Sequence, residues 1–354
     1  MKKLFLSLAI LALAIVACEN NDEVTPNQEA AVDMSDFFVY TPDDVSAKST
    51  NDANNGDKCY SMKVLNQQLK DNPGLEQRMY EIEKHTRTLI ANKGVTATGK
   101  PGGGTTPPPP TPTPYVGVIN IPVVINILES SVGKVTEAQI NSQIAILNED
   151  FNNQNPNTLG VPSIFSGVVS DVQITFTRAN VIRKISSKTA WGTRDAMKSE
   201  TKGGINATDP TNNLNIWVCE IGGGILGYAQ FPGGALATDG VVITTTGFGE
   251  TSGVYGDGRT ATHEIGHWLN LRHIWGDGGC GVDDYVLDTP VAGAANYTCV
   301  EVNSCVEATN DLPDMTMNYM DYVYDNCMYM FTNGQNSRMR SLFGTGGFRE
   351  SFIN

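Results

Sequence analysis

Basic side chains are scarce in this sequence of 354 residues. Its 24 Lys and Arg are outnumbered by 38 Asp and Glu, which gives a formal net charge of −14 at pH 7. Proteins that bind nucleic acid need a basic surface to neutralise phosphates, so the charge balance argues against nucleic acid as a partner. The same charge suits a soluble surface in an extracytoplasmic setting.

The N-terminal apolar run, residues 4–17, is too short to span a bilayer comfortably. Because two lysines precede it, we interpret residues 1–17 as a signal peptide. The run ends in Ile15-Val16-Ala17-Cys18, which resembles the lipobox of bacterial lipoproteins. That resemblance implies that Cys18 is lipidated and becomes the first residue of the mature chain. The alternative is an ordinary signal peptide with a chance cysteine.

Acidic residues follow the predicted lipidation site closely, at Glu19, Asp22 and Glu23. They resemble signals that send some Gram-negative lipoproteins to the outer face of the outer membrane. We therefore expect an extracytoplasmic outer-membrane lipoprotein, exposed at the cell surface or secreted after processing. Its contact with the membrane would be the N-terminal lipid anchor alone.

Histidine is scarcer still, and its distribution is uneven. Three of the four histidines lie within eleven residues, at His263, His267 and His273. His263 and His267 are four residues apart, so on a helix their side chains share one face and can hold one Zn²⁺. His273 reaches the same point only if the helix stops and the chain folds back. Asn270 stands at that position, and Asn is the commonest substitute for glycine at positive φ.

A chance His-Glu-x-x-His within a helix is common, so the short form alone decides little. The third histidine strengthens the zinc interpretation, because three imidazoles leave a fourth position open for water, as in catalytic sites. Glu264 is not needed as a ligand, and its carboxylate is predicted to take a proton from the zinc-bound water.

Composition divides the chain before this motif. Residues 18–57 are polar and predict a flexible tether. Helical spacing of apolar residues follows from Tyr60 to Asn92, and the Gly/Pro-rich residues 101–114 predict a linker. The main domain is then expected over residues 115–354.

Within the main domain the patterns predict an α+β fold. A capping box at Thr136 and Gln139 indicates a helix over 137–153. The zinc helix is expected at about 258–269, capped by Asp257 or Thr260, with Ile265, Trp268 and Leu269 facing inward. Strands are predicted at 116–128, 172–177, 214–218 and 241–245, and an edge strand is predicted within 222–231.

Six cysteines remain after Cys18, and four of them cluster between residues 280 and 327. Disulfides persist in exported proteins, so we expect two bridges in this loop-rich region. Spacing alone does not choose among the three possible pairings. Cys219 ends an apolar strand and is expected to be buried and inert.

Several motifs together resemble one family. The run from His263 to His273 resembles the extended zinc motif of metzincin metallopeptidases, with Asn270 where most members have glycine. Asn-Tyr-Met-Asp-Tyr at 318–322 resembles their Met-turn. Residues 214–231, 288–290 and 327–331 resemble the pappalysin (cytophagalysin-like) family of these zinc metalloproteases. The similarity covers about residues 58–345.

The resemblance implies a metzincin-like zincin fold. A twisted mixed β-sheet and the zinc helix would form an upper lobe above the cleft, and a disulfide-bonded irregular lobe would lie below it. It pairs Cys280 with Cys305 and Cys299 with Cys327. It places Met320 beneath the metal.

Two further residues receive roles from the resemblance. Tyr322 is implied as a catalytic residue that stabilises the oxyanion, or else it is a buried structural tyrosine. Asp325 matches the acidic residue on the floor of the S1′ pocket in members that cleave before Arg or Lys, or else it is a solvated loop residue.

Latency and calcium are also implied by the resemblance. Residues 58–100 resemble an inhibitory pro-segment in which Cys59 occupies the open position on zinc, to be removed by an activating protease. The alternatives are a bond between Cys59 and Cys219, or an idle thiol. Asp284, Asp288 and Thr289 fall in an oxygen-rich loop, with Asp283 beside them, that suits Ca²⁺ or is simply solvated.

The sequence therefore predicts an exported zinc metalloendopeptidase, made as a latent zymogen, that cleaves proteins or peptides with Arg or Lys at P1′. The rival hypothesis is a catalytically decayed surface lipoprotein that binds proteins or matrix.

Overall fold

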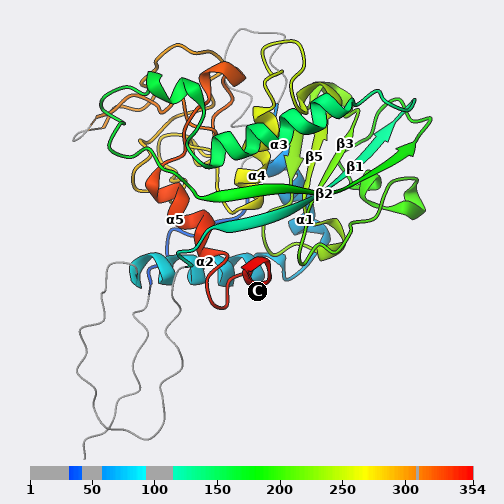
Figure 1. Cartoon of the computed structure of the whole chain (residues 1–354). Coiled ribbons are helices and arrows are strands. Elements are labelled where there is room, and N and C mark those ends of the chain that lie inside the picture. Colours follow the sequence, from blue (N-terminus) through cyan, green and yellow to red (C-terminus); the bar gives the residue numbers. More distant parts are fainter. Residues whose placement is uncertain (1–31, 42–57, 93–114, 308–310, 354) are drawn as a thin grey trace, which may run out of the picture. The chain divides into compact units, whose positions relative to one another are not determined.

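The computed structural model describes residues 32–41, 58–92, 115–307 and 311–353. Five strands form one sheet in the order β2-β1-β3-β5-β4, and all neighbours are parallel except β4, which pairs antiparallel with β5 (Figure 1). The α+β class with a mixed sheet, expected from the sequence, is confirmed. The strands are β1 (Ile119–Glu129), β2 (Ile174–Ile185), β3 (Leu214–Cys219), β4 (Gly227–Ala229) and β5 (Val241–Thr244).

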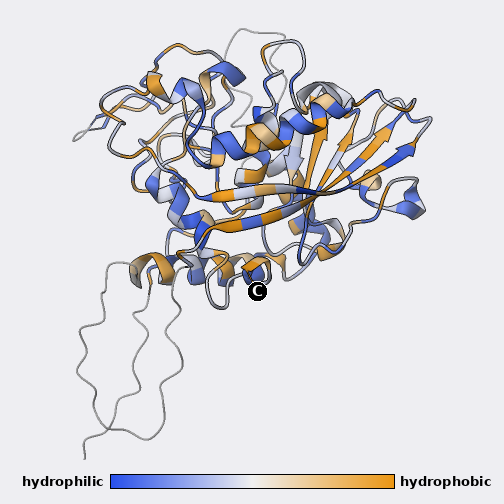
Figure 2. Cartoon of the chain, viewed as in Figure 1, coloured by the Kyte–Doolittle hydropathy of each residue, from blue (hydrophilic) through white to orange (hydrophobic). Residues whose placement is uncertain are grey.

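The inner strands β1, β3 and β5 are covered on both faces, which requires mostly apolar side chains on both faces. β3 and β5 are buried at every residue, and β1 is buried at most of its length. Parallel strands of this kind appear in a sequence as continuous apolar runs. Figure 2 shows this as hydrophobic colour along β1, β3 and β5.

Helix α3 (Glu137–Phe151) begins at the predicted capping box. The Thr136 side chain accepts a hydrogen bond from the N–H of Gln139, whose side chain accepts one from the N–H of Thr136. Ile140, Leu147 and Phe151 of this helix are fully buried in the main core. α3 packs on β2 and on α4 (Arg259–Trp268), so it supports the helix that carries the histidine motif.

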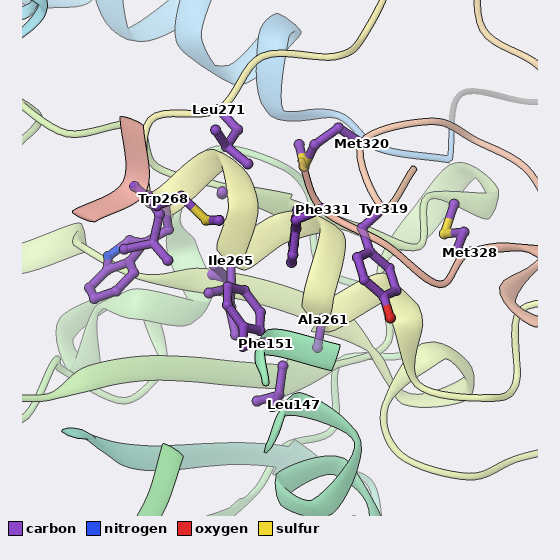
Figure 3. Packing of buried hydrophobic residues seen from close by; sticks show 14 of the residues in the cluster. Leu147, Phe151, Ala261, Ile265, Trp268, Leu271, Tyr319, Met320, Met328 and Phe331 are labelled. Carbon is purple, nitrogen blue, oxygen red and sulfur yellow. The ribbon is translucent and has the colours of Figure 1, made fainter. Parts of the chain in front are cut away.

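Helix α4 is buried along its whole length. Ile265, Trp268 and Leu269 have no exposed surface, as predicted. In Figure 3, Ala261 and Ile265 lie beside Leu147 and Phe151 of α3.

The start of α4 differs from the prediction. Its N-cap is Gly258, with φ 74°, and neither Asp257 nor Thr260 caps the helix with a side chain. One oxygen of the Asp325 carboxylate instead accepts hydrogen bonds from the N–H groups of Asp257 (2.9 Å) and Arg259 (3.1 Å). A residue 66 positions away therefore satisfies the first N–H donor of this helix.

The end of α4 is held by the C-terminal segment. The guanidinium of Arg349 lies 3.4 Å from the centre of the Trp268 ring and donates to the Trp268 carbonyl. It also forms a buried ion pair with Asp239 at 2.9 Å. Residues after α5 (Asn333–Ser341) thus contact the last turn of the histidine helix.

The chain between α4 and α5 is irregular and carries two disulfides, Cys280–Cys305 and Cys299–Cys327. These are the pairs that the family resemblance implies. Cys59 and Cys219 are both buried and free, so the alternative bond between them is absent.

Two helices precede the main domain, α1 (Ser61–Asp71) and α2 (Leu75–Asn92), separated at Asn72-Pro73-Gly74. α1 packs on β4, and α2 packs on α5. Residues 32–41 were expected to be flexible tether, yet Val39 is only 2% exposed and Asn66 of α1 donates to the Thr41 carbonyl. This part of the N-terminal segment is ordered because it contacts the domain.

Several predicted segments lie outside the described residues: the signal peptide (1–17), the lipidation site Cys18, tether residues 19–31 and 42–57, pro-segment residues 93–100 and the linker (101–114). Within the described part of the chain, no helix is long and apolar enough to cross a membrane.

Candidate metal centre

Three histidines converge at the end of α4. His263 and His267 lie one turn apart, and the helix ends before Asn270, whose φ is 71° as its position predicted. The reversal is closed by a hydrogen bond from the Leu271 N–H to the Gly266 carbonyl at 2.9 Å. His267 Nε2 lies 3.2 Å from His263 Nε2 and 3.0 Å from His273 Nε2.

The other ring nitrogen of each histidine has an acceptor. Nδ1 of His263 is 2.7 Å from the Tyr319 carbonyl, and Nδ1 of His267 is 2.8 Å from the Leu271 carbonyl. Nδ1 of His273 lies 2.5 Å from the carboxylate of Asp277. A carbonyl or carboxylate can only accept, so each Nδ1 carries a proton and each Nε2 presents a lone pair.

Three lone pairs at this separation repel one another unless a cation lies between them. The donor set therefore fits Zn²⁺, which neutral imidazoles bind and which acceptors on the opposite ring nitrogens orient. Burial lowers the pKa of His263 to about 3 and that of His267 well below its usual value. Both rings thus stay neutral at physiological pH, as metal binding requires.

Glu264 lies between the histidines in sequence and is 1% exposed. Burial raises its pKa to about 8, against the hydrogen bonds of Ser61 and Cys59, which lower it. The Ser61 hydroxyl donates to Glu264 Oε2 at 2.7 Å, and the Cys59 thiol donates to the same oxygen at 3.4 Å. The carboxylate is therefore beside the histidines but engaged by the N-terminal segment.

Met320 packs directly beneath α4. A Cβ added at Gly266 would lie 2.4 Å from Met320 Sδ, so the helix approaches this methionine as closely as a glycine allows. The Met320 N–H donates to the side chain of Asn318, which fixes the turn. The predicted Met-turn residue thus packs against the histidine helix, and Figure 3 shows it beside that helix.

Tyr322 follows this turn and lies against the histidines. Its ring centre is 4.9 Å from that of His273 and 5.6 Å from that of His263. Its hydroxyl donates to the Cys59 carbonyl at 3.2 Å. Burial, and then the nearby Cys59 thiol, raise the pKa of Tyr322 well above its usual value, so the phenol remains a donor.

Cys59 completes the cluster. Its sulfur and one nitrogen from each of the three histidines all lie within 4.8 Å of one another, and all four residues are buried. Among the described residues, this is the one group of at least three His, Cys, Asp or Glu side chains arranged to hold a metal ion.

The segment around Cys59 runs along the edge strand. Cys59 forms a parallel bridge with Gly227, the Leu226 N–H donates to the Lys58 carbonyl at 2.9 Å, and the Tyr60 N–H donates to the Gly227 carbonyl at 3.0 Å. The Ala229 N–H then donates to the Ser61 hydroxyl at 2.7 Å. The segment thus adds a short strand to β4.

Sequence reasoning missed Ser61, which bonds both Glu264 and β4. No local pattern marks it, because its partners lie 203 and 168 residues away in the sequence. Asp277, the partner of His273, was missed as well. Its position four residues after the third histidine was the sequence signal that could have identified it as the partner of His273.

A cavity opens beside His263 and Glu264. Its walls include Asp325 and Tyr322, and Lys58 of the N-terminal segment also lines it. Burial raises the pKa of Asp325 to about 7, although hydrogen bonds from Arg259 and Asp257 lower it. Asp325 is 1% exposed, so it is not the solvated loop residue that the alternative hypothesis described.

The residues predicted to bind calcium, Asp284, Asp288 and Thr289, do not all contact one another. The Thr289 hydroxyl lies 2.9 and 3.0 Å from the two carboxylate oxygens of Asp284. The oxygens of Asp288 instead accept from the Thr332 hydroxyl (2.6 Å) and the Gly334 N–H (2.9 Å), at the start of α5.

Comparisons with known proteins agree with this chemistry. The family model Peptidase_M43, described as pregnancy-associated plasma protein-A, matches residues 205–344. An extracellular metalloprotease of Pyricularia oryzae is 34% identical over 229 residues, which cover 62% of this chain and 72% of that protein. Extracellular metalloprotease 1 of Coccidioides posadasii is 33% identical and covers 60% of this chain and 70% of its own length.

Solved structures are also similar. Mature mirolysin of Tannerella forsythia in complex with a cleaved peptide has 40% identity and a TM-score of 0.63, over 67% of this chain and 96% of that chain. A promirolysin mutant from the same organism has 35% identity and a TM-score of 0.68, over 83% of this chain and 96% of that chain. The histidine cluster, the fold and these relatives agree, and the chain belongs to the pappalysin family (Peptidase_M43) of zinc metalloproteases.

Proposed function

We propose that this metalloprotease is an exported endopeptidase, made as a zymogen, that cleaves peptide bonds before Arg or Lys. The observation that carries the catalytic part is the convergence of His263, His267 and His273 Nε2 atoms beside the buried carboxylate of Glu264. When bound there, Zn²⁺ would lower the pKa of a water molecule and polarise the scissile carbonyl.

The residues around the metal would do the rest. Glu264 takes the proton of the attacking water and returns it to the leaving amine. The Tyr322 hydroxyl, which now donates to the Cys59 carbonyl, is placed to donate to the oxygen of a scissile carbonyl at the same position. The edge strand β4 binds residues 58–61 in parallel here, and the same strand would bind the substrate backbone in the antiparallel direction.

Glu264→Gln tests this scheme. The variant, activated by cutting in the linker, should retain one zinc per chain and lose turnover of a peptide with internal arginine. Tyr322→Phe should keep zinc and lower kcat more than it raises KM. Turnover by Glu264→Gln at the wild-type rate would contradict the proposal.

The proposed preference for basic P1′ side chains rests on Asp325. Asp325 lines the cavity beside the histidines, and Lys58 of the N-terminal segment lines the same cavity. Asp325→Asn should reduce kcat/KM for Arg at P1′ relative to an uncharged residue of similar length. An unchanged ratio on a peptide library would remove this assignment.

The proposed latency rests on residues 58–61. Their contacts occupy the metal cluster, Glu264, Tyr322 and β4 at once, so a substrate cannot bind while they are in place. The match to promirolysin extends over more of this chain than the match to mature mirolysin, which supports a pro-segment in residues 58–100. We propose that cleavage in the 101–114 linker by an activating protease releases it.

Export and calcium belong to the same proposal. The signal peptide over 1–17 and the lipobox ending at Cys18 support an outer-membrane lipoprotein, and the fungal relatives are named extracellular. Calcium would bind in the loop of Asp284, Asp288 and Thr289. Metal analysis and N-terminal sequencing of the protein isolated from membranes and medium test these two points.

A further inference from the structure

Two arginines of the catalytic domain have partners in the N-terminal segment. Arg338 of α5 forms a bidentate ion pair with Glu83 of α2, with Nη1–Oε1 at 3.0 Å and Nη2–Oε2 at 2.7 Å. Arg272, just before the third histidine, donates from Nη2 to the Phe38 carbonyl at 2.5 Å. Both acceptors belong to residues that the proposed maturation removes.

The two guanidiniums form one site. The Tyr285 ring lies between them, with its centre 5.0 Å from Arg272 and 5.4 Å from Arg338. Both arginines line a single cavity together with Glu83 and Phe231. Nη1 of Arg272 and Nε of Arg338 are buried without a hydrogen-bond partner.

Carboxylates of the catalytic domain do not replace Glu83. Asp277 contributes charge near Arg272, but its Oδ1 is bound to His273 and its buried Oδ2 makes no hydrogen bond to the guanidinium. Asp284 contributes charge near Arg338, but its oxygens accept from Thr289. Loss of residues 32–92 would therefore take the Phe38 carbonyl from Arg272 and the Glu83 carboxylate from Arg338. Arg338 would keep only the carbonyls of Tyr285 and Asn270, and a buried cation without a carboxylate partner is costly.

The position of the arginine cavity along β4 shows which half of the substrate-binding cleft the cavity belongs to. Lys58 lies beside Leu226, Ser61 lies beside Ala229, and Phe231, which lines the arginine cavity, packs on His267 with ring centres 5.2 Å apart. A substrate with its P1′ side chain near Asp325 and paired antiparallel to β4 approaches the metal from the Phe231 end. Its residues before the scissile bond therefore pass the two arginines.

We infer that Arg272 and Arg338 form a carboxylate-binding subsite of the mature enzyme, which takes an acidic substrate side chain roughly two to four residues before the scissile bond, at about 3.3 Å per extended residue. The inference rests on the proposed function, because the site opens only when the pro-segment leaves. Glu83 shows the chemistry of the ligand, since a carboxylate already binds Arg338 in the bidentate geometry that guanidinium favours.

Paired peptides test the subsite in protein that is produced as the full chain and then activated by cleavage in the linker. Each pair has Arg at P1′ and differs only in Glu against Gln at P2, P3 or P4. The ratio of kcat/KM for Glu over Gln should be about tenfold at one of these positions and should fall with added salt. It should drop towards one in Arg338→Gln, remain above one in Arg338→Lys, and stay at the wild-type value in Arg178→Gln, a control on the opposite edge strand β2.

A wild-type ratio near one at all three positions would overturn the inference, and so would a ratio that Arg338→Gln leaves unchanged. Because the wild-type ratio and its salt dependence are measured first, the inference stays testable if Arg338→Gln does not fold. Lack of turnover with both peptides of every pair would instead overturn the proposed function.

Discussion

The ion pair between Glu83 and Arg338 should hold the pro-segment on the catalytic domain. Burial raises the pKa of Glu83, but the charges of Arg338 and Arg87 outweigh it and lower the pKa from 4.5 to about 2. Arg87 lies on the same helix and stays beside Glu83 when the pro-segment undocks, so the lowering corresponds to at most about 3 kcal/mol of docking free energy. Removal of one partner of a buried pair typically costs a similar amount, about 3–5 kcal/mol.

Glu83→Gln should therefore raise the undocked fraction of the pro-segment by up to ~100-fold, since about 1.4 kcal/mol is a factor of ten. Hydrogen exchange of the α2 amides in the uncut protein measures this fraction, and residual turnover of an arginine peptide should rise with it. Glu81→Gln, at an exposed position of the same helix, is the matched control.

The sign of the pH dependence follows from the depressed pKa. The contribution of Glu83 is fully present above about pH 4.5 and is lost as the pH falls through about 2, so wild-type exchange in α2 should accelerate over that interval. Equal protection of α2 in Glu83→Gln and Glu81→Gln would refute the reasoning.

Three further expectations concern the metal centre. Cys59→Ala should raise the activity of the uncut protein. Adding Ser61→Ala should raise it further, because the Glu264 carboxylate then loses both donors from the N-terminal segment. Equal activity of the single and double variants would remove Ser61 from the latency mechanism. Asp277→Asn should weaken zinc binding by roughly 10–100-fold in chelator competition, because His273 loses its acceptor. Burial raises the pKa of Asp325 to about 7, so the preference for Arg at P1′ should strengthen from pH 6 to about pH 8, and a flat profile of this ratio would contradict that assignment.

Local patterns predicted the elements whose determinants lie within one or two turns. The capping box of α3, the inward face of α4 and the reversal at Asn270 all depend on neighbours in the sequence, and the structure has each of them. The strand predicted at 172–177 continues to Ile185. The prediction stopped early because every residue of β2 after Phe176 is at least partly exposed at the sheet edge and the segment shows no apolar alternation.

Contacts between distant residues could not be predicted in the same way. Asp325 satisfies the N-terminus of α4 although Asp257 is the nearer capping residue, because the choice depends on how the irregular region folds back. The ordered contacts of residues 32–41 depend on Arg272 and Tyr285, more than 230 positions away. Their polar composition alone predicted a flexible tether.

The contact of Arg349 with Trp268 sets a limit on how short the protein can be made. The family match ends at residue 344, five positions before this arginine. A chain truncated at that point would leave the Asp239 carboxylate buried without its guanidinium and would uncover the Trp268 ring at the end of the histidine helix. The boundary of the family match is therefore not the boundary of the folding unit, and the histidine helix contacts a segment that this match does not include.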